Sequence, residues 1–551
     1  MIVIPNLKLA PGADEAALKA LAAKALKIPA DDITGLRIRK KSLDARRKDD
    51  IHYVYTVGVT VRGDEQRLVR RCRSAAIAQD KTYPIPHVAP PQTRPVIVGF
   101  GPAGMFAALL LARAGARPIV LERGPDARTR SAQIAAFRAG GPFDPECNVQ
   151  FGEGGAGTFS DGKLNTGTHD ARIGFVLAEF AAHGAPEHIT YDAKPHIGTD
   201  VLVEVVQNLR REVIARGGEV RFGHRMTGLS TQDGHITALT VHSPEGEYTL
   251  PARQVILAIG HSARDTFEML HAQGVPMEPK PFSMGVRIEH RQSDINTAQY
   301  GAAAEHLPAA DYSLSCHLPD GSSAYTFCMC PGGEVFAAAS EQGGVCTNGM
   351  SNSRRDGENA NAAVLVTLHP EDFPDKGTLG GMYWQRSIEQ RAYVCGGGNY
   401  HAPAQRVGDF LAGRASTASG RVQPTYRPGV TWCDLHDVLP QRITATLAQA
   451  LPVFGQKLRG FDAPDAVLTA PETRSSSPVR IVRGERALFG LSNQTCADEL
   501  NAAAGVTRAQ AAAMYNGAMC GWGTPYSDPS NYNETGSYVG PNMEDSHGTE
   551  C

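Results

Sequence analysis

Residues 95–104 read Pro-Val-Ile-Val-Gly-Phe-Gly-Pro-Ala-Gly, a short apolar run that leads directly into a glycine turn. Residues 103–114 are small and aliphatic, which predicts a helix, and the next apolar run, residues 117–122, ends in Glu122. This order predicts one β-α-β unit of about thirty residues. A strand that ends in Gly-x-Gly-x-x-Gly and opens a helix is typical of a dinucleotide-binding fold.

Each glycine of the turn has its own physical task. Gly99 permits the tight turn, Gly101 lets the backbone approach a pyrophosphate, and Gly104 lets the helix pack closely on the strand. The helix starts at Pro102 and Ala103, where free N–H groups and the positive end of the helix dipole attract phosphates. The turn therefore predicts the seat of a dinucleotide.

Further predicted contacts to the dinucleotide lie at the ends of two strands. Glu122 follows Gly104 by 18 residues and is expected to accept hydrogen bonds from ribose hydroxyls, with Arg123 beside it. Residues 255–260, Val-Ile-Leu-Ala-Ile-Gly, form another apolar strand that ends in glycine. We therefore expect Ala258 and Gly260 to lie beside the same ligand.

A second glycine-rich stretch, residues 152–157, reads Gly-Glu-Gly-Gly-Ala-Gly. It follows no clean apolar strand and runs into Thr-Phe-Ser-Asp-Gly-Lys instead of a helix, which disfavours a second nucleotide fold and a reductase with separate FAD and NAD(P)H domains. We expect it to approach the flavin's pyrimidine edge or the pyrophosphate closely, through Gly155, Gly157, Thr158 and Ser160. An ordinary surface loop is the alternative.

The choice of FAD over NAD depends on the spacing of the strands. More than a hundred residues separate Glu122 from the strand that begins at Val255, which is longer than a simple NAD fold requires. Flavoproteins commonly interrupt their nucleotide fold at that place. The predicted cofactor is therefore FAD.

The chain divides into four predicted parts. Residues 1–92 are expected to form a small α/β, ferredoxin-like domain with a proline-rich linker, because a helical pattern at 14–26 is combined with alternating apolar stretches. The other parts are a Rossmann-type FAD-binding domain at 93–265, completed by about 466–495, a mostly β substrate or cap domain at 266–465, and an atypical polar tail at 496–551.

Composition excludes several classes of protein. The net charge of the 551 residues is -3, so no global basic field recruits nucleic acid or an acidic membrane surface. No stretch reaches the roughly 18 apolar residues that span a bilayer. Eleven cysteines without a regular framework suit reduced thiols. We therefore expect a soluble, cytoplasmic protein without nucleic-acid or membrane partners.

Several longer motifs carry a resemblance to a known family. They are Val-Ile-Val-Gly-Phe-Gly-Pro-Ala-Gly-Met-Phe at 96–106, Asn-Val-Gln-Phe-Gly-Glu-Gly-Gly-Ala-Gly-Thr-Phe-Ser-Asp-Gly-Lys at 148–163, Tyr-Thr-Phe-Cys-Met-Cys-Pro-Gly-Gly at 325–333, and shorter matches at 42–52, 348–351, 396–400, 405–410 and 472–480. The chain resembles a family of bacterial FAD-dependent dehydrogenases whose substrate is not assigned. The resemblance implies a flavoprotein of the glutathione-reductase-like superfamily with a small N-terminal domain.

The C-terminal end departs from the family pattern. Flavoproteins of this kind usually close with a second glycine-rich segment and a final helix that faces the flavin's pyrimidine ring. Here residues 488–496 read Leu-Phe-Gly-Leu-Ser-Asn-Gln-Thr-Cys, and a polar tail with a short predicted helix at 507–515 follows. A frameshift, a gene fusion or a divergent ending would each explain the difference. The nucleotide half of the site is expected to be intact, whereas one wall of the ring site is not.

Two clusters are candidates for further chemistry. Cys328 and Cys330 alternate with the pleat of a predicted strand and so face the same side; inert buried thiols are favoured over a redox pair or a zinc site. Residues 472–480, Glu-Thr-Arg-Ser-Ser-Ser-Pro-Val-Arg, would hold a carboxylate through Arg474, line the flavin, or form an ion-paired turn. Generic candidates remain at Arg287, Arg391, Arg406 and His290. No metal site is predicted, and no catalytic residue is assigned.

The sequence therefore predicts an FAD-dependent oxidoreductase that passes hydride through flavin N5 to or from a small molecule. NAD(P)H or a protein would be the electron partner. Two alternatives stay open, namely a flavin monooxygenase and a non-catalytic or inactive FAD-binding variant without the capping segment.

Overall fold

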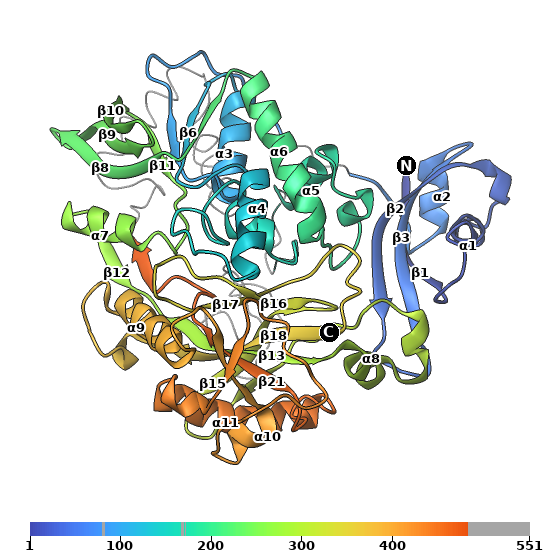
Figure 1. Cartoon of the computed structure of the whole chain (residues 1–551). Helices are drawn as coiled ribbons and strands as arrows, with labels where there is room; N and C mark the ends of the chain where they lie inside the picture. The colour runs from blue at the N-terminus through green and yellow to red at the C-terminus, as the bar shows by residue number, and fades with distance from the viewer. Residues whose placement is uncertain (80–82, 167–169, 171, 483–551) are drawn as a thin grey trace.

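The computed structural model describes residues 1–79, 83–166, 170 and 172–482. Three sheets organise most of these residues, as Figure 1 shows: an N-terminal sheet, a nucleotide-binding sheet and a seven-stranded sheet. Within the described ranges, no helix combines the length and the apolar character needed to cross a membrane.

The N-terminal sheet (blue in Figure 1) has the strand order β2-β3-β1-β4, with every neighbouring pair antiparallel. Two helices complete a β-α-β-β-α-β unit, so the predicted ferredoxin-like arrangement is confirmed. Its core holds Leu18 and Leu26 against Val57 and Val59, all four nearly inaccessible to solvent. The elements are β1 (Ile2–Leu9), α1 (Ala17–Leu26), β2 (Ile33–Asp44), β3 (His52–Val61), α2 (Glu65–Arg71) and β4 (Ala76–Ile77).

The nucleotide-binding sheet is parallel, with the order β11-β5-β6-β7. The apolar runs predicted on both sides of the glycine turn form its two central strands, and every residue of these strands is buried. Helix α3 packs against α6. It also contacts α5, where the ring of Phe180 meets the ring of Phe106 of α3 edge to face. The elements are β5 (Val96–Val98), α3 (Pro102–Arg113), β6 (Ile119–Glu122), α4 (Ala127–Arg138), α5 (Arg172–Ala182), α6 (Thr199–Ala215), β7 (Glu219–Phe222) and β11 (Val255–Leu257).

A smaller antiparallel sheet lies between β7 and β11 in the sequence, with the order β10-β9-β8. Met226 and Leu239 of this sheet pack into the same apolar cluster as Val96 and Val98. Its strands are β8 (Arg225–Gln232), β9 (His235–Ser243) and β10 (Gly246–Pro251), and α7 (Arg264–Ala272) follows β11.

The third sheet has seven strands in the order β14-β15-β18-β13-β21-β19-β20, all antiparallel except the last pair. Strand β18, which lies beside the middle strand β13, is buried at all ten residues, because α11 covers one of its faces and the β16–β17 hairpin also packs on it. The strands are β13 (Phe282–Arg291), β14 (Ser315–His317), β15 (Ser323–Cys330), β16 (Glu334–Ala337), β17 (Thr347–Met350), β18 (Asn359–Leu368), β19 (Ala402–Arg406), β20 (Val430–Trp432) and β21 (Val467–Glu472). The helices are α8 (Gln292–Tyr300), α9 (Gly380–Cys395), α10 (Val407–Leu411) and α11 (Gln441–Lys457).

The structure corrects one expectation about the segment 466–495. Strand β21 does not complete the nucleotide-binding sheet but lies between β13 and β19, because all six of its residues are buried and suit a central strand of a sheet covered on both sides. Beyond it, β22 (Val479–Ile481) pairs with β12 (Met277–Pro279). The described residues end at 482. They therefore do not include the remaining part from 483 to 495, or the tail 496–551 with its predicted helix at 507–515.

Candidate flavin site

The glycine turn has the stereochemistry that its sequence predicts. Gly99 has a φ of 100°, and a Cβ on it would overlap the carbonyl oxygen of Ala258. A Cβ on Gly104 would overlap the carbonyl oxygen of Gly99. At Gly101, by contrast, the nearest atom to a Cβ is the Cα of Gly155, at 3.7 Å. The first and third glycines therefore serve the fold, and the second leaves room for a ligand.

Helix α3 begins at this turn without a side chain to cap it. Gly101 is the N-cap, Pro102 occupies the first turn, and the first turn has no acidic residue. The first N–H groups of a helix have no partner within the helix. The N-terminus of α3 therefore offers donors and a positive dipole end to an anion, which fits a pyrophosphate.

Glu122 is the last residue of β6 and lies against the glycine turn; it is 4 % exposed. One carboxylate oxygen accepts a hydrogen bond from Phe100 N at 2.7 Å, and the other accepts from Gly124 N and Gly152 N, both at 2.9 Å. A carboxylate has about four lone-pair positions, so about one remains for a ribose hydroxyl. Glu122 thus holds the backbone at Phe100, Gly124 and Gly152 and keeps about one acceptor position for the nucleotide.

The second glycine stretch is a buried part of the same site, not a surface loop. Gly154 N donates to Phe100 O at 2.9 Å, and Gly155 and Gly157 begin a short 3₁₀ helix at Gly155–Phe159 where the sequence predicts none. The hydroxyl of Thr158 donates to Glu153 O at 3.2 Å. The loop thus presents mainly backbone to the turn.

Ser160 and Arg123 are also engaged with protein groups. The hydroxyl of Ser160 donates to Gly157 O at 2.8 Å. The guanidinium of Arg123 pairs with Glu146 at 2.7 Å and with Asp265 at 2.8 Å. Arg123 would therefore make its predicted contact with the dinucleotide while paired with Glu146 and Asp265.

Arg130 of α4 holds the second glycine loop in place. Its guanidinium is fully buried and donates to the carbonyl oxygens of Asn148, Val149 and Glu153 at 2.6–2.8 Å. Burial lowers the pKa of Arg130 to about 10. The positive charge is thus spread over backbone dipoles that fix the loop against Phe100.

The end of β11 borders the turn from the other side. Ala258 N donates to Val98 O at 2.8 Å, which continues the parallel pairing of the strands. Gly260 has a φ of 65°, and no atom lies within 4 Å of a Cβ built there. Burial, together with the charges of Arg474 and Arg264, lowers the pKa of the neighbouring His261 to about 4. The imidazole is therefore neutral at pH 7.

A buried ion-pair network joins α7 to α9 and to the segment after β21. Glu389 accepts from Arg264 at 2.9 Å and from Arg474 at 2.7–2.9 Å. All three side chains are at most 4 % exposed. Arg474 is therefore held bidentately by Glu389 of α9, a partner outside the segment 472–480.

The generic candidates are also held by protein groups or lie at the surface. Arg287 is inaccessible to solvent and pairs with Glu472 at 3.0 Å. His290 Nε2 donates to Phe461 O at 2.7 Å, Arg406 pairs with Asp409 at 2.8 Å, and Arg391 is exposed.

Lys163 is a site residue that the sequence did not single out. Its Nζ lies 3.9 Å from Cys328 Sγ, 3.5 Å from Cys330 Sγ and 3.3 Å from Asp161. The simple pleat predicted for the two cysteines is wrong, because β15 has an irregularity between Phe327 and Cys330 and Cys328 has a φ of 42°. Both sulfur atoms nevertheless contact one ammonium group. Only the Asp-Gly-Lys end of the glycine motif hinted at this residue.

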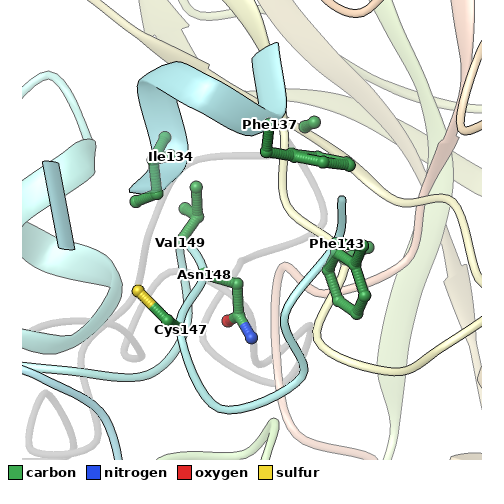
Figure 2. Close-up of a pocket in the computed structure, with 8 residues that line it drawn as sticks. Ile134, Phe137, Phe143, Cys147, Asn148 and Val149 are labelled. Carbon is green, nitrogen blue, oxygen red and sulfur yellow. The ribbon is translucent and has the colours of Figure 1, made fainter. Parts of the chain in front are cut away.

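A small pocket lies between α4, the loop before the second glycine stretch and β16. Figure 2 shows Ile134 and Phe137 on the helix opposite Cys147 and Val149 on the loop. Its polar side chain, Asn148, is bonded to backbone groups of its own loop. The pocket is therefore apolar and lacks the converging polar groups of a substrate site.

Glu179, His183 and Glu212 are the side chains at metal-ligand spacing within the described part of the chain. Arg113 pairs with Glu179 at 2.6 Å and with Glu212 at 2.8 Å. A guanidinium therefore already provides the positive charge between these carboxylates.

Comparisons with known proteins agree with this geometry. Residues 92–141 match the family described as "FAD binding domain", residues 281–475 match "FAD-dependent protein, C-terminal domain-like", and residues 1–60 match a domain of unknown function. The chain is 44% identical over 489 residues to an uncharacterized protein of Clostridium beijerinckii, covering 88% of this chain and 91% of the relative.

Solved structures with a similar part include an anhydrotetracycline hydroxylase from Streptomyces rimosus (19% identical, TM-score 0.23) and an aklavinone-11 hydroxylase in complex with FAD and aklavinone (16% identical, TM-score 0.25). They cover 50% and 54% of this chain, and the chain spans about half their length, 46% and 49%. TM-scores this low carry no inference about the reaction.

The residues at the glycine turn fit the cofactor that these families bind. The close relative covers nearly the whole chain, and the matched families cover β5 and β6 of the nucleotide-binding sheet and all seven strands of the seven-stranded sheet. The chain binds FAD and belongs, with its Clostridium beijerinckii relative, to a family of FAD-dependent proteins.

Proposed function

We propose that this protein is an FAD-dependent oxidoreductase that passes hydride to or from a small molecule. The observation that carries the proposal is the cradle between Gly101 and Gly155. There the uncapped start of α3 meets the second glycine loop, and Glu122 bonds to both. Bound FAD would supply the hydride-accepting ring, and the protein supplies position and electrostatics.

The chain's own residues have separate tasks in this proposal. The N–H groups at Ala103 and Gly104 hold the pyrophosphate, and the free acceptor position on Glu122 holds a ribose hydroxyl. The open space beside Gly260 admits the ligand next to the strand end. The ion pairs of Arg264 with Glu389 hold α7 against α9.

The finer classification is part of the same proposal. We place the protein in the glutathione-reductase-like superfamily, because a three-stranded antiparallel sheet is inserted before the last parallel strand of the nucleotide-binding sheet. We divide the chain at residues 92, 265 and 465, with the seven-stranded sheet as the substrate part. We also propose a cytoplasmic location and NAD(P)H or a protein as electron partner.

A flavin monooxygenase is the second candidate. Several of the similar solved structures are hydroxylases, and one is a p-nitrophenol 4-monooxygenase. Hydroxylation is therefore the reaction class to be tested against hydride transfer.

The test is the visible spectrum of the purified full chain, followed by anaerobic addition of NADPH. The proposal expects a flavin spectrum that a nicotinamide or a small organic donor bleaches. Re-oxidation in air with stoichiometric hydroxylated product identifies the monooxygenase. Re-oxidation without a hydroxylated product supports the dehydrogenase.

Two outcomes contradict the proposal. Protein that is colourless and binds no added FAD excludes a flavoenzyme. A bound flavin that no biological reductant bleaches, in a protein that FAD nevertheless stabilises, identifies a non-catalytic FAD-binding protein.

A further inference from the structure

Two thiols and one ammonium group meet where the second glycine loop contacts the seven-stranded sheet. Lys163 lies eight residues beyond Gly155 on the loop, and Cys328 and Cys330 end β15. The ammonium is 3.9 Å from one sulfur atom and 3.5 Å from the other. The contact joins segments 165 residues apart, so it is made by the tertiary fold alone.

The backbone at Cys328 is held in an unusual conformation. Its φ of 42° lies in the left-handed region, which non-glycine residues adopt at a cost in energy. Its carbonyl oxygen accepts from Arg287 Nη1 at 2.9 Å and from Cys330 Sγ at 3.2 Å. These bonds bring the second thiol back toward the first.

The surrounding charges favour one anionic sulfur. Three cations act on the site, and two carboxylates pair with them. The cations are Lys163, Arg287 and Arg355, and the carboxylates are Asp161 and Glu472. Three cations and two carboxylates leave one positive charge, which one thiolate would neutralise. The other titratable groups near the cluster are Tyr312 and His196.

The hydrogen bonds and charges around the pair decide which sulfur carries the charge. Cys330 is 0 % exposed, whereas Cys328 is partly exposed. A hydrogen bond from Cys330, then the charges of Lys163 and Arg287, lower the pKa of the Cys328 thiol well below its usual value. Burial raises the pKa of the Cys330 thiol. Cys328 is therefore the anion and Cys330 the neutral thiol, although Lys163 lies slightly nearer to Cys330.

We propose that Cys328 is a nucleophilic thiolate, that Cys330 is its resolving thiol, and that the pair is a modification site for small hydroperoxides. The thiolate attacks the distal peroxide oxygen, the O–O bond breaks, and with one proton the products are a sulfenic acid and an alcohol or water. The Cys330 thiol then displaces the sulfenic hydroxyl as water and forms a disulfide. In sum, two thiols are oxidised by two electrons and one peroxide is reduced.

Such a disulfide would be reversible. A bridge across a single residue is strained, and strained disulfides are more easily reduced than structural ones. The site uses only side chains of this chain, so it does not depend on the flavin reaction.

The first experiment measures alkylation of Cys328 by iodoacetamide in the full-length protein from pH 5 to pH 9, resolved by peptide mass spectrometry. The rate is expected to have its midpoint well below about 8.5, the value of an ordinary thiol. Lys163→Met should raise this midpoint by about one pH unit and lower the rate about tenfold at pH values well below the wild-type midpoint, because a shift of one pKa unit changes the thiolate fraction tenfold there. Lys163→Arg should restore most of it. Cys72 is the internal reference thiol.

The second experiment adds one equivalent of hydrogen peroxide and then analyses the same peptide. The wild-type peptide should lose two hydrogens, whereas Cys330→Ser should stop at a sulfenic acid that dimedone traps at Cys328. Cys328→Ser should leave Cys330 reduced. Circular dichroism of each variant verifies that it is folded.

The proposal is overturned by an ordinary midpoint for Cys328 that Lys163→Met does not move. It is also overturned if peroxide oxidises Cys72 or other thiols first and leaves the Cys328–Cys330 peptide reduced. If a cysteine variant fails to fold, the pH profile of the wild type and of Lys163→Arg still decides between these outcomes.

Discussion

The carboxylate of Glu122 accepts a hydrogen bond from the backbone N–H of Gly152 at 2.9 Å. Its other oxygen accepts from Phe100 N at 2.7 Å. One side chain thus joins two glycine stretches that are separated by α4. The cofactor site is consequently built by the β6 strand end as much as by the glycine turn itself.

Glu122→Gln should weaken both the fold and FAD binding. An amide in place of the carboxylate turns an N–H group toward the N–H groups of Phe100 or Gly152, and an unsatisfied buried donor costs about 1–3 kcal/mol. Urea unfolding and FAD titration measure the two effects, with a Kd increase of about tenfold or more expected. Exposed Glu305→Gln is the control. Unchanged affinity in a folded Glu122→Gln protein would remove Glu122 from the site.

Gly99→Ala and Gly101→Ala should have opposite signatures. The first places a Cβ against the carbonyl oxygen of Ala258 at a φ of 100°, so the unfolding free energy should fall by about 2 kcal/mol or more. The second meets only Gly155 Cα at 3.7 Å, so stability should change by less than about 1 kcal/mol while FAD affinity falls about tenfold. Equal FAD affinity of Gly101→Ala and wild type would contradict the proposed pyrophosphate seat.

Arg130→Lys should loosen the second glycine loop. A lysine ammonium is a point charge and does not reproduce a planar guanidinium that serves several carbonyl oxygens. We expect a loss of about 1–3 kcal/mol in unfolding free energy and weaker FAD binding. Arg128→Lys on the same helix is the matched control, because the side chain of Arg128 is 69% exposed. Equal stabilities of the two variants would show that Arg130 does not order the loop.

Glu389→Gln should destabilise the protein by about 3–5 kcal/mol at pH 7, because two buried arginines lose their shared anion. Burial raises the pKa of Glu389, but the charges of Arg264 and Arg474 outweigh burial and hold it well below its usual 4.5. A carboxyl with a lowered folded-state pKa stabilises the protein above its unfolded pKa and loses this contribution as the pH falls.

The stability difference between wild type and Glu389→Gln should therefore shrink from about pH 5 downward. Guanidinium unfolding at pH 7, 5, 4 and 3 measures it, with exposed Glu371→Gln as control. A difference that does not depend on pH in this range would mean that folding does not lower the pKa of Glu389.

The strand, turn and helix at residues 95–122 were predictable from the sequence because their determinants are local. A run of apolar residues specifies a buried strand, and Gly104 is required because a Cβ there would overlap the carbonyl oxygen of Gly99, five residues earlier. The ferredoxin-like N-terminal sheet was predictable for the same reason, since its helix and strands show clear periodicities.

Contacts between distant segments were decided only by the tertiary structure. The sequence did not place β21 between β13 and β19, pair Arg474 with Glu389, or bring Lys163 to Cys328 and Cys330. These contacts depend on which buried surfaces pack together, and the periodicity of a segment records that it is buried without recording its partner. The sequence by itself therefore determined the nucleotide-binding turn and the cofactor class, whereas the fold determined which distant side chains contact one another.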